Sequence, residues 1–84
     1  MNKVKVLEKN DNVATALEDL KTGVIVKYNF RTEEMVIKIL DDISYGHKFA
    51  IKDIKKNSPV IKYGEIIGKA SKDIKTGEHV HIHN

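Results

Sequence analysis

A chain of 84 residues, 40% of them hydrophobic, has the length and composition of one small folded domain, which we place at residues 1–84. The net charge of +3 comes from scattered lysines, without the basic stripe and stacking aromatic residues that favour nucleic-acid binding. The absence of cysteine excludes disulfides and thiolate chemistry, and no apolar run reaches the roughly 20 residues of a membrane span, so we expect a cytoplasmic protein.

The chain opens with a strand pattern and continues with a helical one. The run KVKVLEK alternates valine with lysine, which is the two-residue period of a strand. In DNVATALEDLKTG, four aliphatic residues fall at helical spacing: Val13, Ala16, Leu17 and Leu20. Asp11 is suited to be the N-cap of a helix here, and Gly23 is suited to end it in a left-handed conformation. We therefore predict one short helix over this segment.

From Val24 onward the sequence predicts strands and turns. VIVKYNF and EMVIKIL are β-branched runs joined by the polar RTE, which is typical of a hairpin. Shorter apolar runs follow, namely KFAI, PVIKY, EIIGKA and HVHIH. Gly68 interrupts one of these runs, which favours a bulge or close packing. The predicted fold class is α+β, mainly β with one short helix, in one compact barrel-like domain.

A local pattern recurs four times, as DLKTGVIV, DISYGHKF, DIKKNSPV and DIKTGEHV. In each copy we expect the aspartate to cap a short turn and the following Leu or Ile to anchor that turn in the core. The Gly or Asn then takes the positive φ that starts the next strand. Because the intervals between copies are irregular, we interpret the pattern as one turn type used repeatedly in one domain, rather than as a solenoid.

The C-terminal residues GEHVHIHN place three histidines, His79, His81 and His83, at every second position. In a strand these imidazoles share one face, while the intervening Val80 and Ile82 point into the core. Neighbouring residues on one face lie roughly 6.5–7 Å apart, so two imidazoles, but not all three, can bind one metal ion. The missing ligands would come from His47, from substrate or from another chain. Alternatively, the histidines are polar residues on an exposed strand face.

His47 and Lys48 follow directly after Gly46. A glycine lets the backbone approach a ligand closely, and the two side chains supply a proton shuttle and a positive charge. An ordinary turn explains the same residues. The sequence contains no paired acids, serine nucleophile motif or zinc-protease helix, so the remaining chemistry is general acid–base catalysis, metal assistance or anion binding.

Two further pairs of residues could contact an anionic substrate. Lys62 can hold a carboxylate and Tyr63 can donate a hydrogen bond, although both residue types are also common on exposed strands. Asp11 and Asn12 precede the predicted helix, whose free N–H groups attract anions. Simple capping of the helix accounts for this second pair equally well.

Four stretches of this chain together resemble the small N-terminal domain of the altronate and galactarate dehydratase family, a SAF-type domain with a β-clip fold. They are DNVATAL, GHKFAIKDI, VIKYGEIIGKASKDI and GEHVHIHN, and the resemblance covers nearly the whole chain. Asn57 stands where the family usually has glycine, a change that asparagine tolerates at positive φ. Residues 24–40 carry no family signature, so they indicate nothing about the substrate.

In that family the domain is joined to, or assembles with, a larger domain to form a divalent-metal-dependent lyase for hydroxylated acids. The resemblance therefore implies a separately encoded small subunit that is inactive alone and pairs with a large catalytic lyase subunit, as in the related sulfolactate sulfo-lyases. The implied cofactor is iron(II), manganese or magnesium, shared between the two subunits. Self-association into a homo-oligomer remains an option for the isolated chain.

The implied reaction is elimination from a hydroxy acid: a base removes the proton α to the carboxylate, and a metal or an acid assists departure of hydroxide or sulfite. The candidate catalytic residues are His47, His79 and His81, and the candidate metal ligands are His79, His81 and His83. The candidate substrate-binding residues are Lys48, Lys62, Tyr63, Asn84, Asp11 and Asn12. The competing hypothesis is a stand-alone binding module that recognises a sugar acid or a metal without catalysis.

Overall fold

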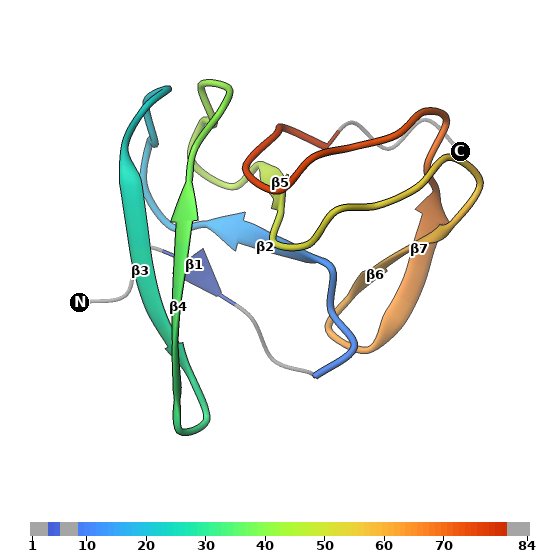
Figure 1. Cartoon of the computed structure of the whole chain (residues 1–84), viewed down its shortest axis with the longest axis horizontal. Coiled ribbons are helices and arrows are strands. Elements are labelled where there is room, and N and C mark those ends of the chain that lie inside the picture. The colour runs from blue at the N-terminus through green and yellow to red at the C-terminus, as the bar shows by residue number, and fades with distance from the viewer. Residues whose placement is uncertain (1–3, 6–8, 81–84) are drawn as a thin grey trace.

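The computed structural model of the chain describes residues 4–5 and 9–80, which form three small antiparallel sheets (Figure 1). The central sheet has the strand order β1-β2-β5 and contains β1 (Val4–Lys5), β2 (Val13–Ala16) and β5 (Lys48–Ala50). The other two sheets are hairpins, one made of β3 (Ile25–Phe30) and β4 (Glu33–Lys38), the other of β6 (Pro59–Lys62) and β7 (Glu65–Lys69). The mainly β prediction is confirmed, but the described residues form no closed barrel.

The predicted helix is wrong, and no helix occurs in the described residues. Its first half forms β2, and Leu20 in its second half makes an isolated bridge with Ile43. β2 lies between β1 and β5, with Val13 packed in one hydrophobic cluster and Ala14 in the other. A strand that is buried on both faces has a mostly apolar sequence without alternation. Over a short segment, such a sequence cannot be distinguished from a helix by the spacing of its apolar residues. No helix in the described part of the chain could cross a membrane.

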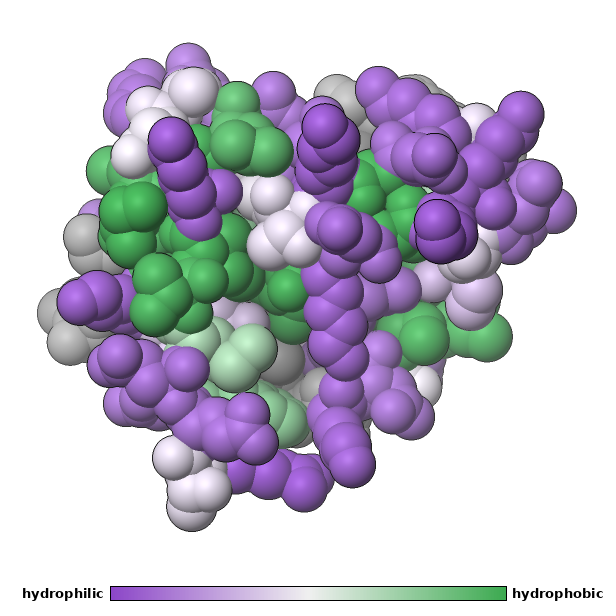
Figure 2. All heavy atoms as spheres, viewed as in Figure 1, coloured by the Kyte–Doolittle hydropathy of each residue, from purple (hydrophilic) through white to green (hydrophobic). Residues whose placement is uncertain are grey.

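The first hairpin agrees with the sequence prediction, and the second contains the predicted bulge. VIVKYNF and EMVIKIL pair as β3 and β4 around the turn Arg31–Thr32. In the second hairpin Val60 pairs with Gly68, whereas the next residue, Ile61, pairs with Ile66. This shift of register beside Gly68 is the predicted bulge. On the outward face of the first hairpin, Ile25 and Val36 are exposed, and Figure 2 shows apolar residues grouped over these strands.

The four aspartate turns pair two by two, and each pair exchanges its caps. In the first pair, the Asp19 carboxylate accepts the Tyr45 N–H at 2.8 Å, and the Asp42 carboxylate accepts the Thr22 N–H at 2.9 Å. Leu20 and Ile43, the aliphatic anchors of the two turns, form an isolated antiparallel β-bridge. The aspartates therefore cap the partner turn, and the prediction that each caps its own turn is wrong.

The second pair of turns repeats this arrangement. Asp73 accepts the Lys56 N–H at 2.8 Å, and Asp53 accepts the Thr76 N–H at 2.9 Å. The predicted anchors of all four turns are buried: Leu20, Ile43, Ile54 and Ile74. The predicted positive φ is present at all four turn formers: Gly23, Gly46, Asn57 and Gly77. Each hairpin is thus enclosed by a pair of interlocked turns, and the chain contains two such units, residues 19–46 and 53–77.

The central sheet joins two hydrophobic clusters. Phe49 and Ala14 pack with the side chains of the first unit, including Tyr28 and Ile43. Their neighbours along the same strands face the other way and pack with the second unit, in a cluster formed by Val13, Ala50, Ile54, Val60, Ala70, Ile74 and Val80. Because successive side chains of β2 and β5 enter different clusters, both units depend on the same sheet.

Candidate functional site

His47 and His79 are 32 positions apart in the sequence and lie side by side at one end of the central sheet. His47 precedes β5, and His79 forms an isolated bridge with Phe49 within β5. Nδ1 of His47 is 3.2 Å from Nε2 of His79, and the ring centroids are 5.4 Å apart with an interplanar angle of 31°. His47 is exposed and His79 is half-buried, so a ligand can reach the pair from solvent.

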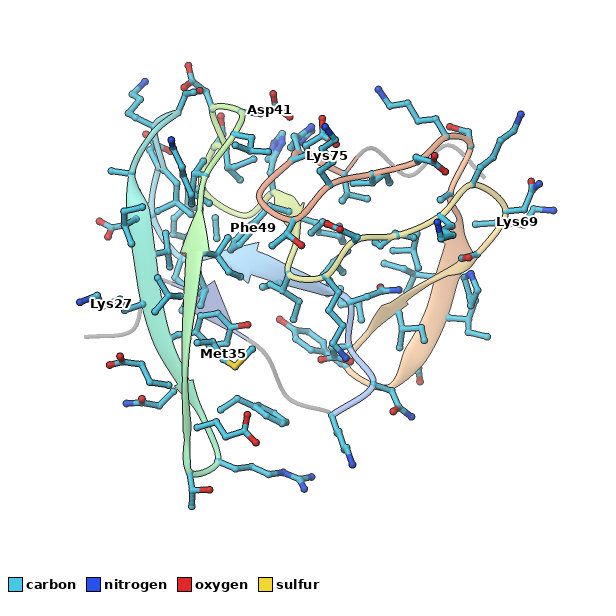
Figure 3. The ribbon with its side chains drawn as sticks, viewed as in Figure 1. Lys27, Met35, Asp41, Phe49, Lys69 and Lys75 are labelled. Carbon is cyan, nitrogen blue, oxygen red and sulfur yellow. The ribbon has the colours of Figure 1, made fainter. Side chains whose placement is uncertain are left out.

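Backbone contacts fix the segment that carries His79. Its N–H donates to Oδ2 of Asp41 at 2.9 Å, and Asp41 lies at the top of the molecule in Figure 3. The next residue, Val80, donates its N–H to the Lys48 carbonyl at 3.0 Å, and its side chain is buried. The predicted inward orientation of Val80 is therefore confirmed. Sequence reasoning missed Asp41, for which the doubled aspartate at 41–42 was the available signal.

A glycine with positive φ precedes each histidine of the pair: Gly46 has φ 83°, and Gly77, two positions before His79, has φ 93°. A Cβ on Gly77 would lie 2.1 Å from the carbonyl oxygen of Lys38, which is far inside van der Waals contact. Only glycine fits there without moving the backbone. The glycine of the fourth turn thus permits a close approach to the end of β4, two positions before His79.

The geometry of the histidine pair suits two kinds of chemistry. At 3.2 Å, one nitrogen can donate a proton to the other in a hydrogen bond. Two nitrogens bound to one metal ion at about 2.1 Å would lie about 3.0–3.4 Å apart at octahedral or tetrahedral angles, so the pair also fits two adjacent metal ligands. Within residues 4–5 and 9–80, no cluster of three or more His, Cys, Asp or Glu could hold a metal. Two nitrogens alone would supply only part of the four or more ligands that a metal ion usually takes.

Three of the predicted site residues, His81, His83 and Asn84, lie outside the described residues, and so does Ile82. The proposed sharing of one metal by His79 and His81 therefore stays a prediction. The structure instead places His79 beside His47, which the sequence had suggested as one source of a missing ligand.

Lys62 and Tyr63 are positioned by the turn of the second hairpin. The Tyr63 hydroxyl donates to Oγ1 of Thr15 at 3.3 Å, and the Lys62 ammonium lies 5.0 Å from the centroid of the Tyr63 ring. Thr15 pairs with Lys48 between β2 and β5, so the Tyr63 hydroxyl contacts the residue directly opposite Lys48. Because side chains alternate along a strand, Lys48 leaves β5 on the face opposite to Phe49. The structure therefore does not gather these three residues with the histidine pair.

Asp11 and Asn12 hold the start of β2 against the second hairpin. Asp11 is 1% exposed and accepts the Gly64 N–H at 2.7 Å. The Asn12 amide donates to the Pro59 carbonyl at 2.9 Å and accepts the Ile61 N–H at 2.7 Å. The basis for predicting an anion site here was the N-terminus of a helix, and that helix is absent. In the structure these two side chains connect strands.

Comparison with known proteins adds a family to this geometry. The family model of the altronate/galactarate dehydratase SAF domain matches residues 2–84. Altronate dehydratase of Bacillus subtilis (strain 168) is 44% identical over 78 residues, which are 93% of this chain and 15% of that protein. Altronate dehydratase of Escherichia coli (strain K12) is 49% identical over 74 residues, which are 88% of this chain and 14% of that protein.

A shorter relative also matches. The (2R)-sulfolactate sulfo-lyase subunit alpha of Chromohalobacter salexigens is 46% identical over 54 residues, which are 64% of this chain and 55% of that subunit. The chain therefore spans about one seventh of the two altronate dehydratases and about half of the sulfo-lyase subunit.

Proposed function

The chain belongs to the altronate/galactarate dehydratase SAF-domain family, and on that basis we propose that it is the small subunit of a lyase completed by a large catalytic partner. The proposed substrate is a hydroxylated sugar acid, and the proposed reaction is the elimination of water. Two features of the relatives support this proposal. The long relatives are named dehydratases, and the short one is named as a subunit of a sulfo-lyase.

The observation that carries the proposal is the histidine pair. Its two nitrogens are held 3.2 Å apart, with His47 exposed and His79 half-buried. A partial ligand set that opens to solvent is suited to a site that a second polypeptide completes. His47 and His79 would hold a divalent cation there, and two nitrogen donors suit iron(II) or manganese better than magnesium, which prefers oxygen. Such a cation would stabilise the negative charge that develops at the substrate carboxylate.

The chain's own residues would bind the substrate and transfer protons. In the elimination, a base takes the proton α to the carboxylate, the C–O bond at the neighbouring carbon breaks, and the departing hydroxide takes a proton to leave as water. If the pair holds no cation, His47 has the exposed ring required of a group that exchanges a proton with a bound substrate. His81, His83 and Asn84 follow His79 closely in the sequence and would extend the same site.

Reconstitution with a partner tests the proposal. The tagged chain is co-expressed with a large polypeptide of an altronate dehydratase-type lyase, and the purified material is assayed for elimination from altronate and galactarate. We expect a stable complex, with activity in the complex and none in either chain alone. If the tagged chain captures no large partner, and no added partner gives elimination activity, the proposal is wrong.

Two rival functions give different results in the same experiment. A carbon–sulfur lyase, which the sulfo-lyase relative suggests, would release sulfite from sulfolactate and leave the sugar acids unchanged. A binding module without catalysis is supported by the 3.2 Å spacing of the two histidine nitrogens, which fits two adjacent ligands of one metal ion. That module would bind manganese or a sugar acid as the isolated chain, and it would show no turnover with any partner.

A further inference from the structure

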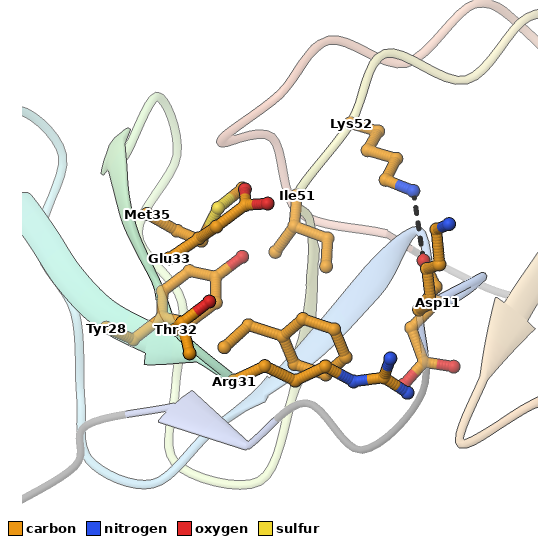
Figure 4. Close-up of a pocket in the computed structure, with 10 residues that line it drawn as sticks. Asp11, Tyr28, Arg31, Thr32, Glu33, Met35, Ile51 and Lys52 are labelled. Atoms are coloured by element: carbon orange, nitrogen blue, oxygen red, sulfur yellow. Dashed lines mark hydrogen bonds between the residues drawn. The ribbon is translucent and has the colours of Figure 1, made fainter.

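A pocket of about 330 Å³ lies between the tip of the β3–β4 hairpin and the residues that follow β5 (Figure 4). Its apolar wall is formed by Phe30, Met35 and Ile51. Three cationic residues, Lys9, Arg31 and Lys52, and two acidic residues, Asp11 and Glu33, complete the lining together with Tyr28 and Thr32. Residues 51–52 follow β5, whereas His47 precedes it, so the pocket and the histidine pair lie at opposite ends of this strand.

Tyr28 contributes its hydroxyl to this pocket. The residue is only 6% exposed, and its hydroxyl points into the pocket in Figure 4. No described residue forms a hydrogen bond with that hydroxyl. Burial raises the pKa of Tyr28, so the group stays a neutral O–H donor at physiological pH. No buried side-chain polar atom of the described residues lacks a hydrogen-bond partner, so this hydroxyl is open to the pocket, where it can donate to a ligand.

Arg31 stands in a backbone conformation that favours glycine. It has φ 58° in the two-residue turn of the hairpin, where a glycine would meet no steric cost. Its guanidinium carbon lies 5.3 Å from the centroid of the Phe30 ring, and Figure 4 shows the charged group extending along the pocket toward Asp11. A strained position that carries a long cationic side chain indicates a function for that side chain.

The charges around the pocket favour an anion. Lys52 donates from Nζ to the Lys9 carbonyl at 3.2 Å, which holds its ammonium group at the pocket wall. Of the two acids, Asp11 already accepts the Gly64 N–H at 2.7 Å. Three cations against two carboxylates leave a net positive charge beside an apolar surface.

We infer that this pocket binds a small organic anion, a carboxylate with a short hydrocarbon body. The carboxylate would lie between Arg31 and Lys52 and accept the Tyr28 hydroxyl, and the hydrocarbon part would pack against Phe30 and Ile51. A volume near 330 Å³ is at the lower end of the range for small-molecule pockets. This inference uses none of the histidines, so it stands or fails independently of the proposed lyase function.

The test is a titration of the whole ¹⁵N-labelled chain with butyrate, followed by amide chemical shifts. Butyramide, which has nearly the same shape but no charge, is the matched control ligand. We expect saturable shifts at residues 30–33 and 51–53 with butyrate, and none at those positions with butyramide. The inference is overturned if butyrate gives no saturable shifts, if butyramide gives equal shifts, or if the shifts centre on His47 and His79.

Three variants sharpen this test. Arg31→Gly removes the cation and the strain together, so we expect butyrate binding to weaken about tenfold while the thermal midpoint holds or rises. Tyr28→Phe removes only the hydroxyl, and we expect a loss of several-fold. Lys27→Ala removes an exposed cation from the outward face of β3 and should leave binding within twofold of wild type. Equal binding by Arg31→Gly and Lys27→Ala would contradict the assigned site.

Discussion

Gly77 packs its backbone closely against the end of β4, two positions before His79. Its φ is 93°, and a Cβ added there would lie 2.1 Å from the Lys38 carbonyl oxygen, which leaves no room for a side chain. By contrast, Gly23 has nearly the same φ of 92°, and a Cβ there would meet nothing within 4 Å. The two glycines therefore separate the cost of backbone strain from the cost of a steric clash.

Gly77→Ala should destabilise the fold more than Gly23→Ala does. For Gly23→Ala we expect a loss of about 1–2 kcal/mol in the free energy of unfolding, because only the left-handed conformation is strained. For Gly77→Ala we expect a loss above about 3 kcal/mol, because the backbone must also move away from Lys38. Urea denaturation followed by circular dichroism measures both values. Equal losses would show that the close approach at Gly77 contributes nothing.

At the scale of single residues, the sequence predicted local conformation better than long-range contacts. Positive φ at Asn57 and Gly77 followed from turn chemistry that involves only neighbouring residues. The contact between Asp41 and the His79 N–H joins residues 38 positions apart, and no local pattern encodes it. The closeness of His47 and His79 could be suggested from shared residue type, but the 3.2 Å geometry could not.

At the scale of elements, the interlocked turns connect the two ends of each unit. Asp42 accepts the Thr22 N–H at 2.9 Å and the Thr22 hydroxyl at 2.8 Å, and Asp53 accepts both donors of Thr76 at 2.9 Å. The backbone N–H is the larger cause and the hydroxyl the next in lowering the pKa of each carboxyl from its ordinary 3.8. Both caps therefore favour the ionised aspartate.

These caps predict an acid-sensitive fold. Because the folded pKa lies below the unfolded one, the stabilisation is complete above about pH 3.8 and is lost as the pH falls through the lower folded value. The double variant Asp42→Asn/Asp53→Asn keeps an oxygen acceptor but cannot titrate. Thermal midpoints measured from pH 7 to about pH 2.5 should therefore fall less steeply for this variant than for wild type.

Glu34→Gln is the matched control for the acid titration, since it removes one exposed carboxylate from β4, where no interlocked turn is involved. We expect its pH profile to follow the wild-type profile. If the aspartate double variant also follows the wild-type profile, the interlocked turns do not stabilise the fold through their charges.

Element types were predictable where one face of a strand meets water, and unpredictable where neither face does. β3 alternates exposed and buried positions, and its hairpin with β4 was predicted within a residue or two. β2 is covered on both sides, so its VATA sequence lost the alternation that identifies a strand. The turns were found from their aspartates, but the exchange of caps requires knowing which turns are partners in space.

At the scale of the whole molecule, the two units share β2 and β5 and should unfold together. Ile43 lies in the first cluster and Ile54 in the second, and both are nearly fully buried. We expect Ile43→Val and Ile54→Val each to cost about 0.5–1.5 kcal/mol and to lower the midpoint of one common transition. Amide peaks from both units, followed by NMR during urea unfolding, measure this directly. Separate midpoints for the two units would contradict the shared sheet.

The sequence could predict a small, mainly β domain, because β-branched runs and turn residues dominate it. It could not predict how the sheets are arranged, since barrel closure depends on pairings between strands far apart in the chain. The family resemblance indicated a lyase, and the comparisons place the chain in the same family. Neither the resemblance nor local patterns indicated the pocket beside Tyr28, which forms only when the hairpin folds over the end of β5.

The central claim is that His47 and His79 act as one unit in a site shared with a large lyase partner. Turnover of the reconstituted complex with His47→Ala, His79→Ala and the double variant tests it most directly. We predict that each single variant assembles normally and loses at least about 100-fold in kcat, and that the double variant is no worse than either single variant. Wild-type turnover by a fully assembled double variant would contradict the account.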